Sequence, residues 1–325
     1  MFDSSIFNLN SETSFKEKAL AVFNYQAQNN PVYKSFLNFL NCNPEEVKQI
    51  KDIPFLPIRF FKSHKVLTGQ DNEEICFLSS GTTGQNQSKH YVNCLKQYEA
   101  SYLNAFKHFY GKVSDYTILA LLPSYLDRKG SSLIYMVTDL IKQSGKPKSG
   151  FYLDDFKVLH KTLNELDKKG EKILLIGVSF ALLDLIEKYS FNLKNTLVME
   201  TGGMKGRRKE LVRKDLHQKL SSGFGVKNIH SEYGMTELLS QSYSKGKGLF
   251  KTPPWMKILI RDTEDALSIL PHNQTGGINV IDLANINSCS FIATQDLGKT
   301  YANNSFEILG RFDNSDIRGC NLMVV

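Results

Sequence analysis

The stretch KILLIGVSFALLDLIEKYSFNLKNTLVMETGG, residues 172–203, contains one complete unit of the fold. Its short apolar runs KILLIGV and TLVME predict strands, and the amphipathic segment FALLDLIEKY between them predicts a helix. A strand, a helix and a second strand in this order are typical of a parallel pair joined by a crossover helix.

The same alternation extends from Tyr116 to Tyr233 and predicts an α/β core with a mainly parallel sheet. Further strands are expected at TILALL (117–122) and VKNIH (226–230). Further helices are expected near SLIYMVTDLIKQ (132–143), DDFKVLHKTLNEL (154–166) and RKELVRKDLHQKL (208–220). The second of these helices carries one apolar stripe that we expect to pack into the core, formed by Phe156, Leu159, Leu163 and Leu166.

The first 75 residues predict a helical lead-in to this core. Ser14 and Glu17 form a capping-box pattern at the start of a helix, which Asn29, Asn30 and Pro31 end. A second short helix is expected at 32–40, followed by the segment DIPFLPIRFF (52–61), which we expect to be extended and packed.

After Tyr243 the pattern changes to short β-rich runs separated by turn residues, which predicts a smaller β subdomain. These runs are WMKILI, GINVIDL, SFIATQDL and SFEILG. The expected organisation is a helical lead-in at 1–75, an α/β core at 76–240, a β-rich subdomain at 241–310 and a tail at 311–325.

The composition is that of a globular protein, with 41% hydrophobic and 22% charged residues. The net charge of +7 leaves two interpretations open, an anionic ligand or a solvated basic surface. Since this balance is the only feature that favours nucleic acid, we expect no nucleic-acid partner.

The five cysteines have no C-x-x-C spacing and are odd in number, so neither a zinc site nor a closed disulfide framework is expected. Reduced thiols fit the cytoplasm best. The N-terminus lacks the pattern of a signal peptide, and the most apolar stretch, 173–186, is too short to span a bilayer and contains Asp184. We therefore expect a cytoplasmic protein that is not integral to a membrane.

The densest group of hydroxyls and glycines is Ser79-Ser80-Gly81-Thr82-Thr83-Gly84, followed by Lys89. Glycine allows a loop to come close to phosphate oxygens, which backbone N–H groups and hydroxyls can then surround. The stretch is not a Walker A loop, because no Gly-Lys-Ser/Thr follows at the required spacing. An ordinary surface turn remains the alternative for this stretch.

A second group, His230 to Glu237 (HSEYGMTE), follows the last expected strand, where α/β sheets bind ligands. Tyr233 has a ring that can stack on a base, Thr236 a hydroxyl for a phosphate, and Glu237 a carboxylate for Mg²⁺. The alternative is a hairpin or a helix start that Thr236 or Glu237 caps.

Three weaker motifs complete the set. Gly202 and Gly203 lie in a glycine-rich turn directly after the strand TLVME, where a nucleotide can lie against the backbone. Asp296 in TQDLG (294–298) and Arg311 in GRFD (310–313) are a carboxylate and a guanidinium that can hold ribose hydroxyls.

In this order, the motifs SSGTTG, YGMTE, TQDLG and GRFDNSDI resemble those of the adenylate-forming superfamily of acyl-CoA ligases, luciferases and peptide-synthetase adenylation domains. The chain most resembles the LuxE-like acyl-protein synthetase branch, with phenylacetate-CoA ligases nearer than luciferases. The resemblance implies an adenylation domain at 1–310 and a hinge-like motif with a tail at 311–325. The family's mobile C-terminal domain and its catalytic lysine are expected to be absent.

The resemblance also implies a reaction: ATP and Mg²⁺ activate a carboxylic acid, expected to be a fatty acid, as acyl-AMP. Thr236, Glu237 and Lys89 would be catalytic, with Glu237 as the metal ligand, although four residues separate Lys89 from the TTG motif. The nucleotide-binding residues would be Ser79, Ser80, Gly81, Thr82, Thr83, Gly84, Gly202, Gly203, Tyr233, Asp296 and Arg311. Ser124, Gly177, Val178, Ser179 and His230 are candidates for the acyl pocket because they lie at expected strand ends.

Acyl-protein synthetases carry a cysteine near the C-terminus that accepts the acyl group, and Cys320 matches it. Arg318 nearby would lower its pKa and favour the thiolate. The acyl group would then pass to a partner protein, a reductase or a carrier. Two alternatives stay open: direct transfer to CoA or another external thiol, and a noncatalytic nucleotide-binding scaffold.

Overall fold

The apolar runs between 117 and 201 form the parallel centre of the fold. The computed structural model describes residues 2–80, 87–123, 130–153, 155–202 and 211–312. In it β5 (Gly150–Phe151), β4 (Thr117–Leu121), β6 (Ile173–Val178), β7 (Thr196–Thr201) and β8 (His230–Tyr233) lie side by side and pair in parallel. Every residue of β4 and β6 is buried, as expected where helices cover both faces of a sheet.

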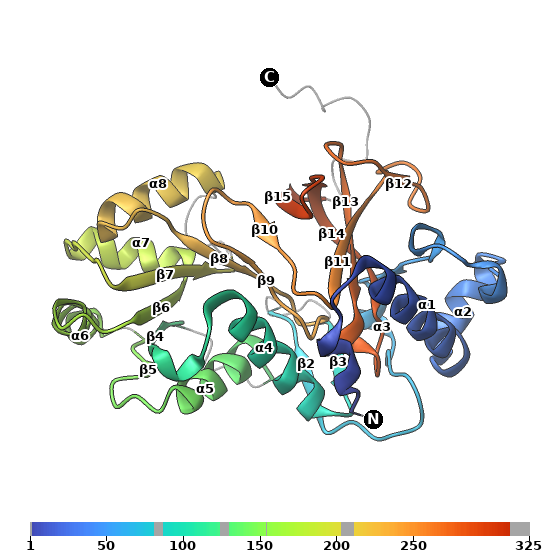
Figure 1. The fold of residues 1–325 in the computed structure, drawn as a ribbon, viewed down its shortest axis with the longest axis horizontal. Coiled ribbons are helices and arrows are strands. Elements are labelled where there is room, and N and C mark those ends of the chain that lie inside the picture. Colours follow the sequence, from blue (N-terminus) through green and yellow to red (C-terminus); the bar gives the residue numbers. More distant parts are fainter. Residues whose placement is uncertain (1, 81–86, 124–129, 154, 203–210, 313–325) are drawn as a thin grey trace.

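The covering helices are α4 (Leu95–Tyr110), α5 (Ser132–Ser144), α6 (Phe156–Lys168), α7 (Ser179–Lys188) and α8 (Arg213–Phe224). Figure 1 shows α4 and α5 on one face of the parallel strands and α7 and α8 on the other. Leu159, Leu163 and Leu166 of α6 are buried, which confirms the predicted stripe, with Phe156 half-buried at its start. The sequence analysis missed α4, whose Tyr98, Tyr102 and Phe106 enter the core. No helix within the described ranges is long and apolar enough to cross a bilayer.

The expected strand at 226–230 is wrong in its position. Gly225 ends α8 in the left-handed conformation, and the Val226 N–H then bonds back to the Ser221 carbonyl. The chain therefore becomes extended only at His230, and Tyr233 is the last residue of β8. Similarly, α8 begins at Arg213, after Leu211 and Val212.

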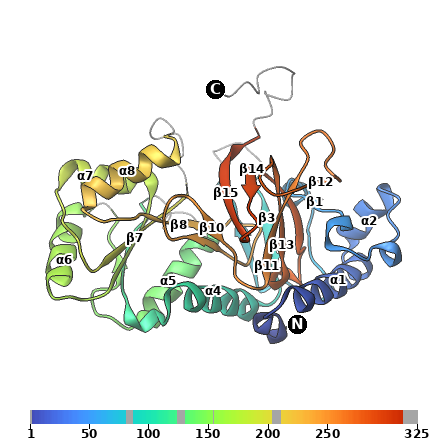
Figure 2. The same ribbon diagram turned by 45° about the horizontal axis from the view of Figure 1, so that its top comes forward.

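The sheet continues past β8 without a break into the β-rich part (Figure 2). Next to β8 follow, in order, β9 (Ser242–Ser244), β10 (Phe250–Lys251), β15 (Ser305–Arg311), β14 (Phe291–Thr300), β13 (Thr275–Asp282), β11 (Met256–Arg261) and β12 (Ile269–Leu270), all antiparallel. A short β1 (Leu56–Pro57) adds to β14 in parallel. The four expected β-rich runs all form strands, within the same sheet as the core.

The N-terminal helices pack on the β-rich part, away from α7 and α8 (Figure 1). They are α1 (Glu12–Asn29), α2 (Pro31–Phe39) and the short α3 (Phe60–Ser63), with 3-10 turns at Ser4–Asn8, Pro44–Glu46 and Ile50–Asp52. Two further 3-10 turns follow α4 and β13, at Val113–Asp115 and Leu283–Asn285. The capping box of α1 is formed by Ser11 and Ser14, so the expected pair of Ser14 and Glu17 is wrong by one helical turn. The end of α1 at Asn29 is as expected, because Asn30 caps α2 and Pro31 occupies its first turn.

Two helix-ending glycines give a test of the packing at the end of α8. Gly225 and Gly145 both have left-handed backbones, but a Cβ on Gly225 would lie 2.8 Å from the Asn192 Cα, whereas one on Gly145 would meet nothing within 4 Å. We expect Gly145→Ala to destabilise the fold by about 1 kcal/mol through backbone strain. Gly225→Ala should cost about 1–3 kcal/mol more through overlap. Urea unfolding measures the loss of unfolding free energy in both variants. Equal losses would show that overlap with Asn192 adds nothing to the cost at Gly225.

Candidate functional site

The serine-rich stretch connects β2 (Ile75–Leu78) and β3 (Lys89–Val92), which pair as an antiparallel hairpin. Its expected phosphate-contacting residues Gly81, Thr82, Thr83 and Gly84 lie outside the described residues. Ser79 and Ser88 form the neck of the turn, where two hydrogen bonds join the ends of β2 and β3. The Ser79 N–H donates to the Ser88 carbonyl at 3.0 Å, and the Ser88 N–H donates to Ser79 Oγ at 2.9 Å. Ser80 follows this neck and is exposed.

The neck of the turn lies against the YGMTE motif. His90 Nδ1 lies 2.7 Å from the Thr236 carbonyl oxygen, a contact that spans 146 positions of the chain. The side chain of the buried Ser88 also lowers the pKa of Glu237, so it lies close to that carboxyl. The two motifs that sequence analysis expects around one nucleotide are thus in contact through the residues that flank the turn.

Lys89 lies on the other side of this hairpin. Side chains alternate along a strand, and in β3 the buried His90 faces Thr236, so the exposed Lys89 points away from it. The charges of Arg311 and Lys62, in contrast, act on Glu237. Sequence analysis missed His90 and Lys62, although the alternation beside Lys89 is a signal that one neighbour faces inward.

Glu237 is buried, with 6% of its surface exposed. Burial raises the pKa of its carboxyl, and the Ser88 side chain and the charges of Arg311 and Lys62 lower it. Mg²⁺ often binds one protein carboxylate together with substrate phosphates, so a single buried carboxylate fits this ion. Within the described ranges, no group of three or more His, Cys, Asp or Glu side chains could hold a metal by itself.

Tyr233, Asp296 and Arg311 form a second polar cluster. The Tyr233 hydroxyl donates to Asp296 Oδ2 at 2.7 Å, and Arg311 Nε donates to Asp296 Oδ1 at 3.0 Å. Asp296 and Arg311 are opposite each other on β14 and β15, so the antiparallel register sets this ion pair. Burial, followed by the charge of Asp296, raises the pKa of Tyr233. Because the charge of Arg311 also acts on Glu237, the two clusters lie near each other.

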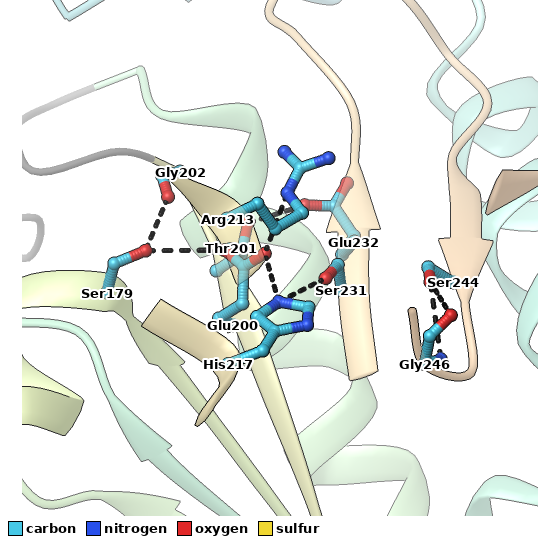
Figure 3. A network of polar contacts seen from close by, with 10 residues as sticks. All are labelled: Ser179, Glu200, Thr201, Gly202, Arg213, His217, Ser231, Glu232, Ser244 and Gly246. Carbon is cyan, nitrogen blue, oxygen red and sulfur yellow. Dashed lines mark hydrogen bonds and ion pairs between the residues drawn. The ribbon is translucent and has the colours of Figure 1, made fainter. Parts of the chain in front are cut away.

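The carboxyl ends of β7 and β8 carry a further network, drawn in Figure 3. Ser179 Oγ donates to the Gly202 carbonyl at 2.9 Å and lies 3.3 Å from Glu200 Oε2. His217 Nε2 lies 3.4 Å from Glu200 Oε1 and 3.3 Å from Ser231 Oγ. These contacts hold the backbone at Gly202 beside the strand end. The second expected glycine, Gly203, lies outside the described residues.

Glu232, in the same network, has an unusual carboxyl group. Thr201 Oγ1 donates to its Oε2 at 2.5 Å. Burial raises the pKa of Glu232 to about 7, and the neighbouring Glu200 charge adds to this rise while the Thr201 bond opposes it. A Cβ on Gly234 would lie 2.5 Å from Glu232 Oε1, so this carboxyl borders the glycine of the YGMTE motif.

Of the candidates for the acyl pocket, Gly177, Val178 and Ser179 are consecutive at the end of β6 and the start of α7, and His230 begins β8. Val178 is in the core, and a Cβ on Gly177 would lie 2.8 Å from Leu182 Cδ2, so close packing accounts for that glycine. His230 also lines a surface pocket of about 610 Å³ that includes the first residues of β6 and β7. Burial, then the charges of Lys245 and His217, lower the pKa of His230 to about 4. Ser124 lies outside the described residues.

The described cysteines offer no activated thiol. Burial raises the pKa of Cys42 and of Cys76, and that of Cys289 to about 12, whereas a reactive cysteine needs a lowered pKa. Cys94 is buried. Cys320, the expected acyl acceptor, lies outside the described residues.

Comparison with known proteins gives a family match and a curated relative. A family model described as acyl-protein synthetase, LuxE, matches residues 128–325, more than half of the chain. The long-chain-fatty-acid–luciferin-component ligase of Vibrio harveyi is 25% identical over 321 residues, which cover 92% of this chain and 84% of that protein.

Solved structures of adenylate-forming enzymes share the fold. An open conformation of 2-hydroxyisobutyryl-CoA ligase, in complex with 2-HIB-AMP and CoA, superposes with a TM-score of 0.64 at 13% identity, over 93% of this chain and 70% of that one. An ATP-bound RpMatB-BxBclM chimera gives a TM-score of 0.58 at 19% identity, over 75% of this chain and 48% of the chimera. The chain thus spans about half the length of the chimera.

The raised pKa of Glu232 predicts a change of stability with pH. Between its ordinary pKa of 4.5 and about 7, the folded protein keeps a proton on Glu232 that the unfolded chain has lost. The free energy of unfolding of the wild type should therefore fall as pH rises through this window, by roughly 3 kcal/mol relative to Glu232→Gln. Denaturant unfolding of both proteins at pH 5 and 7.5 measures this difference, in which the contributions of histidines cancel. Parallel pH profiles would show that Glu232 titrates normally.

Proposed function

This chain belongs to the LuxE family of acyl-protein synthetases, and from that premise we propose that it activates a fatty acid with ATP and transfers the acyl group to a thiol. The observation that carries the proposal is the contact of Ser88 and His90 with Thr236 and Glu237, next to the Tyr233–Asp296–Arg311 cluster. The name of the Vibrio harveyi relative supports a long-chain fatty acid as substrate. The ATP and the acyl-AMP in the solved structures support the nucleotide.

In this proposal the nucleotide lies across the carboxyl ends of β7 and β8 and the facing strands β14 and β15. The adenine lies between Tyr233 and the Gly202–Gly203 turn, and Asp296 and Arg311 hold the ribose. The phosphates lie along the turn at 79–84, with the Thr236 hydroxyl directed at the α-phosphate. Hydroxyls and N–H groups fixed in place before the reaction stabilise the charge that develops on phosphate oxygens.

The first step forms acyl-AMP. A carboxylate oxygen of the acid bonds to the α-phosphorus, and the bond from this phosphorus to the pyrophosphate oxygen breaks. Glu237 would hold Mg²⁺, which neutralises phosphate charge when bound. Lys62, whose charge already acts on Glu237, adds positive charge beside the phosphates.

The second step moves the acyl group to Cys320. The Cys320 thiolate bonds to the carbonyl carbon of acyl-AMP, and AMP leaves with the electron pair of the broken C–O bond. Burial of the described thiols supports this assignment, because raised pKa values make them poor nucleophiles. A nucleophile of an acceptor protein, a reductase or a carrier in the cytoplasm, then bonds to the same carbonyl carbon, and Cys320 leaves as a thiolate.

Transfer to an external thiol is the second candidate for this step. It is motivated by the CoA bound in the 2-hydroxyisobutyryl-CoA ligase structure. The two schemes share adenylation and differ only in the first acceptor. A covalent acyl-protein therefore distinguishes them.

Exchange of labelled pyrophosphate into ATP tests adenylation, across acids of graded chain length. We expect acid-dependent exchange by the wild type, and a loss of at least about 100-fold in Glu237→Gln because the carboxylate for Mg²⁺ is gone. Cys320→Ser should keep full exchange, since it changes only the second step. Wild-type protein that binds ATP without any exchange would be a noncatalytic module.

Mass spectrometry of the intact protein after incubation with ATP and acid tests the acceptor. An acyl adduct should form on the wild type and on the matched control Cys76→Ser, a half-buried cysteine. The adduct should be absent from Cys320→Ser. Should it survive in Cys320→Ser, or fail to form while acyl-CoA accumulates, Cys320 is not the acceptor.

A further inference from the structure

Three polar side chains with no exposed surface lie behind the YGMTE motif: Gln26, His90 and Asn285. They come from α1, from β3 and from the 3-10 turn that follows β13. Fully buried polar side chains lower the stability of a fold unless each is hydrogen-bonded. Their contacts therefore indicate what they hold in place.

Asn285 and His90 hold the two main-chain carbonyls of Thr236 and Glu237. Asn285 Nδ2 donates to the Glu237 carbonyl oxygen at 2.8 Å. Its amide oxygen lies 3.0 Å from His90 Nε2, and His90 Nδ1 lies 2.7 Å from the Thr236 carbonyl oxygen. Both contacts engage the main chain, so the Thr236 hydroxyl and the Glu237 carboxylate stay available to other partners.

Gln26 fixes Asn285 in turn. Its Nε2 donates to the carbonyl oxygens of Asn285 at 3.1 Å and Ile286 at 2.9 Å, and its Oε1 accepts from the Ser290 N–H at 2.9 Å. The contact from Gln26 to Asn285 spans 259 positions. The helical lead-in is thereby joined through Asn285 to the motif at the centre of the site.

The hydrogen count of this array shows that one of its contacts lacks a hydrogen. Thr236 and Glu237 both present carbonyl oxygens, which only accept. The Asn285 amide nitrogen donates to the Glu237 carbonyl, so the Asn285 side-chain oxygen faces His90 Nε2. A neutral His90 carries only one N–H, but its two ring nitrogens face two oxygens, those of Thr236 and of Asn285. An apolar pair in place of His90 and Asn285 would leave the Thr236 and Glu237 carbonyls without a donor, so the array both satisfies these carbonyls and sets their position.

We propose that Gln26, Asn285 and His90 are positioning residues that fix the main chain at Thr236 and Glu237, so that the hydroxyl meets the α-phosphate and the carboxylate meets Mg²⁺. The inference rests on the proposed function. Residues that orient a metal ligand from behind commonly change metal affinity or activity 10–100-fold when they are replaced. A residue that only stabilises the fold changes the melting temperature and leaves these quantities alone.

Asn285→Asp tests the array with almost no change in shape. It replaces the donor to the Glu237 carbonyl by an oxygen, which repels it. In pyrophosphate exchange we expect kcat to fall about 10-fold or more and the Mg²⁺ concentration for half activity to rise about 10-fold, with the KM for the acid changed less than about 2-fold.

Asn30→Asp is the matched control. Asn30 is as buried as Asn285, and its Nδ2 donates to Ser288 of the same loop at 2.8 Å and to Thr68 at 3.1 Å. It is not one of the residues that bond to Thr236 or Glu237. We expect a lower melting temperature in Asn30→Asp and an unchanged Mg²⁺ requirement.

His90 provides a second test if Asn285→Asp folds poorly. His90→Ala removes the contact with the Thr236 carbonyl and should lower kcat about 10-fold. His90→Asn keeps an N–H at the place of Nδ1 and should recover most of that loss. The inference is overturned if both His90 variants are as active as the wild type, or if Asn285→Asp and Asn30→Asp depend equally on Mg²⁺. Either result leaves the proposed function standing. Wild-type protein without exchange overturns the proposed function, and the inference with it.

Discussion

The buried carboxylate of Asp282 ties the two halves of the molecule together. It accepts hydrogen bonds from the Leu239 N–H at 2.8 Å, the Ser240 N–H at 2.9 Å and the Ser240 hydroxyl at 2.5 Å, and from the Ala284 N–H at 3.2 Å. Burial raises the pKa of Asp282, and these four bonds oppose the rise. A carboxylate without exposed surface is tolerated only with such a set of donors. The segment after YGMTE is therefore fixed to the end of β13.

The candidate site lies along this seam. β8 brings Tyr233 from the parallel half, and β14 and β15 bring Asp296 and Arg311 from the antiparallel half. Register shifts between Gly277 and Asn279 and between Leu297 and Gly298 interrupt the ladders next to Asp296. Such bulges redirect side chains. The half-buried Arg261 spans the first of them, donating to Ile278, Asn279 and Thr294.

The sequence allowed the prediction of those parts of the fold and site that depend on local patterns. Apolar runs and an amphipathic stripe were enough for β4, β6, β7 and α6, and the order of the motifs was enough to expect the turn at 79–84 beside Thr236 and Glu237. The pattern misplaces the start of β8 because the apolar run at 226–230 hides the end of α8 at Gly225. Asn285 gave no signal, because its importance comes only from contacts with residues far away in the chain.

The geometry around Tyr233 favours a site whose aromatic face is fixed before a nucleotide binds. The edges of Phe250 and Phe306 pack against the ring with centroids 6.1 and 5.9 Å away, and its hydroxyl is held by Asp296. An ionised carboxylate offers about four acceptor positions, of which Tyr233 and Arg311 use two. Asp296 can thus accept the ribose hydroxyls of the proposed nucleotide without releasing Tyr233. Since neither group has to rearrange, less of the binding energy is lost to ordering the site.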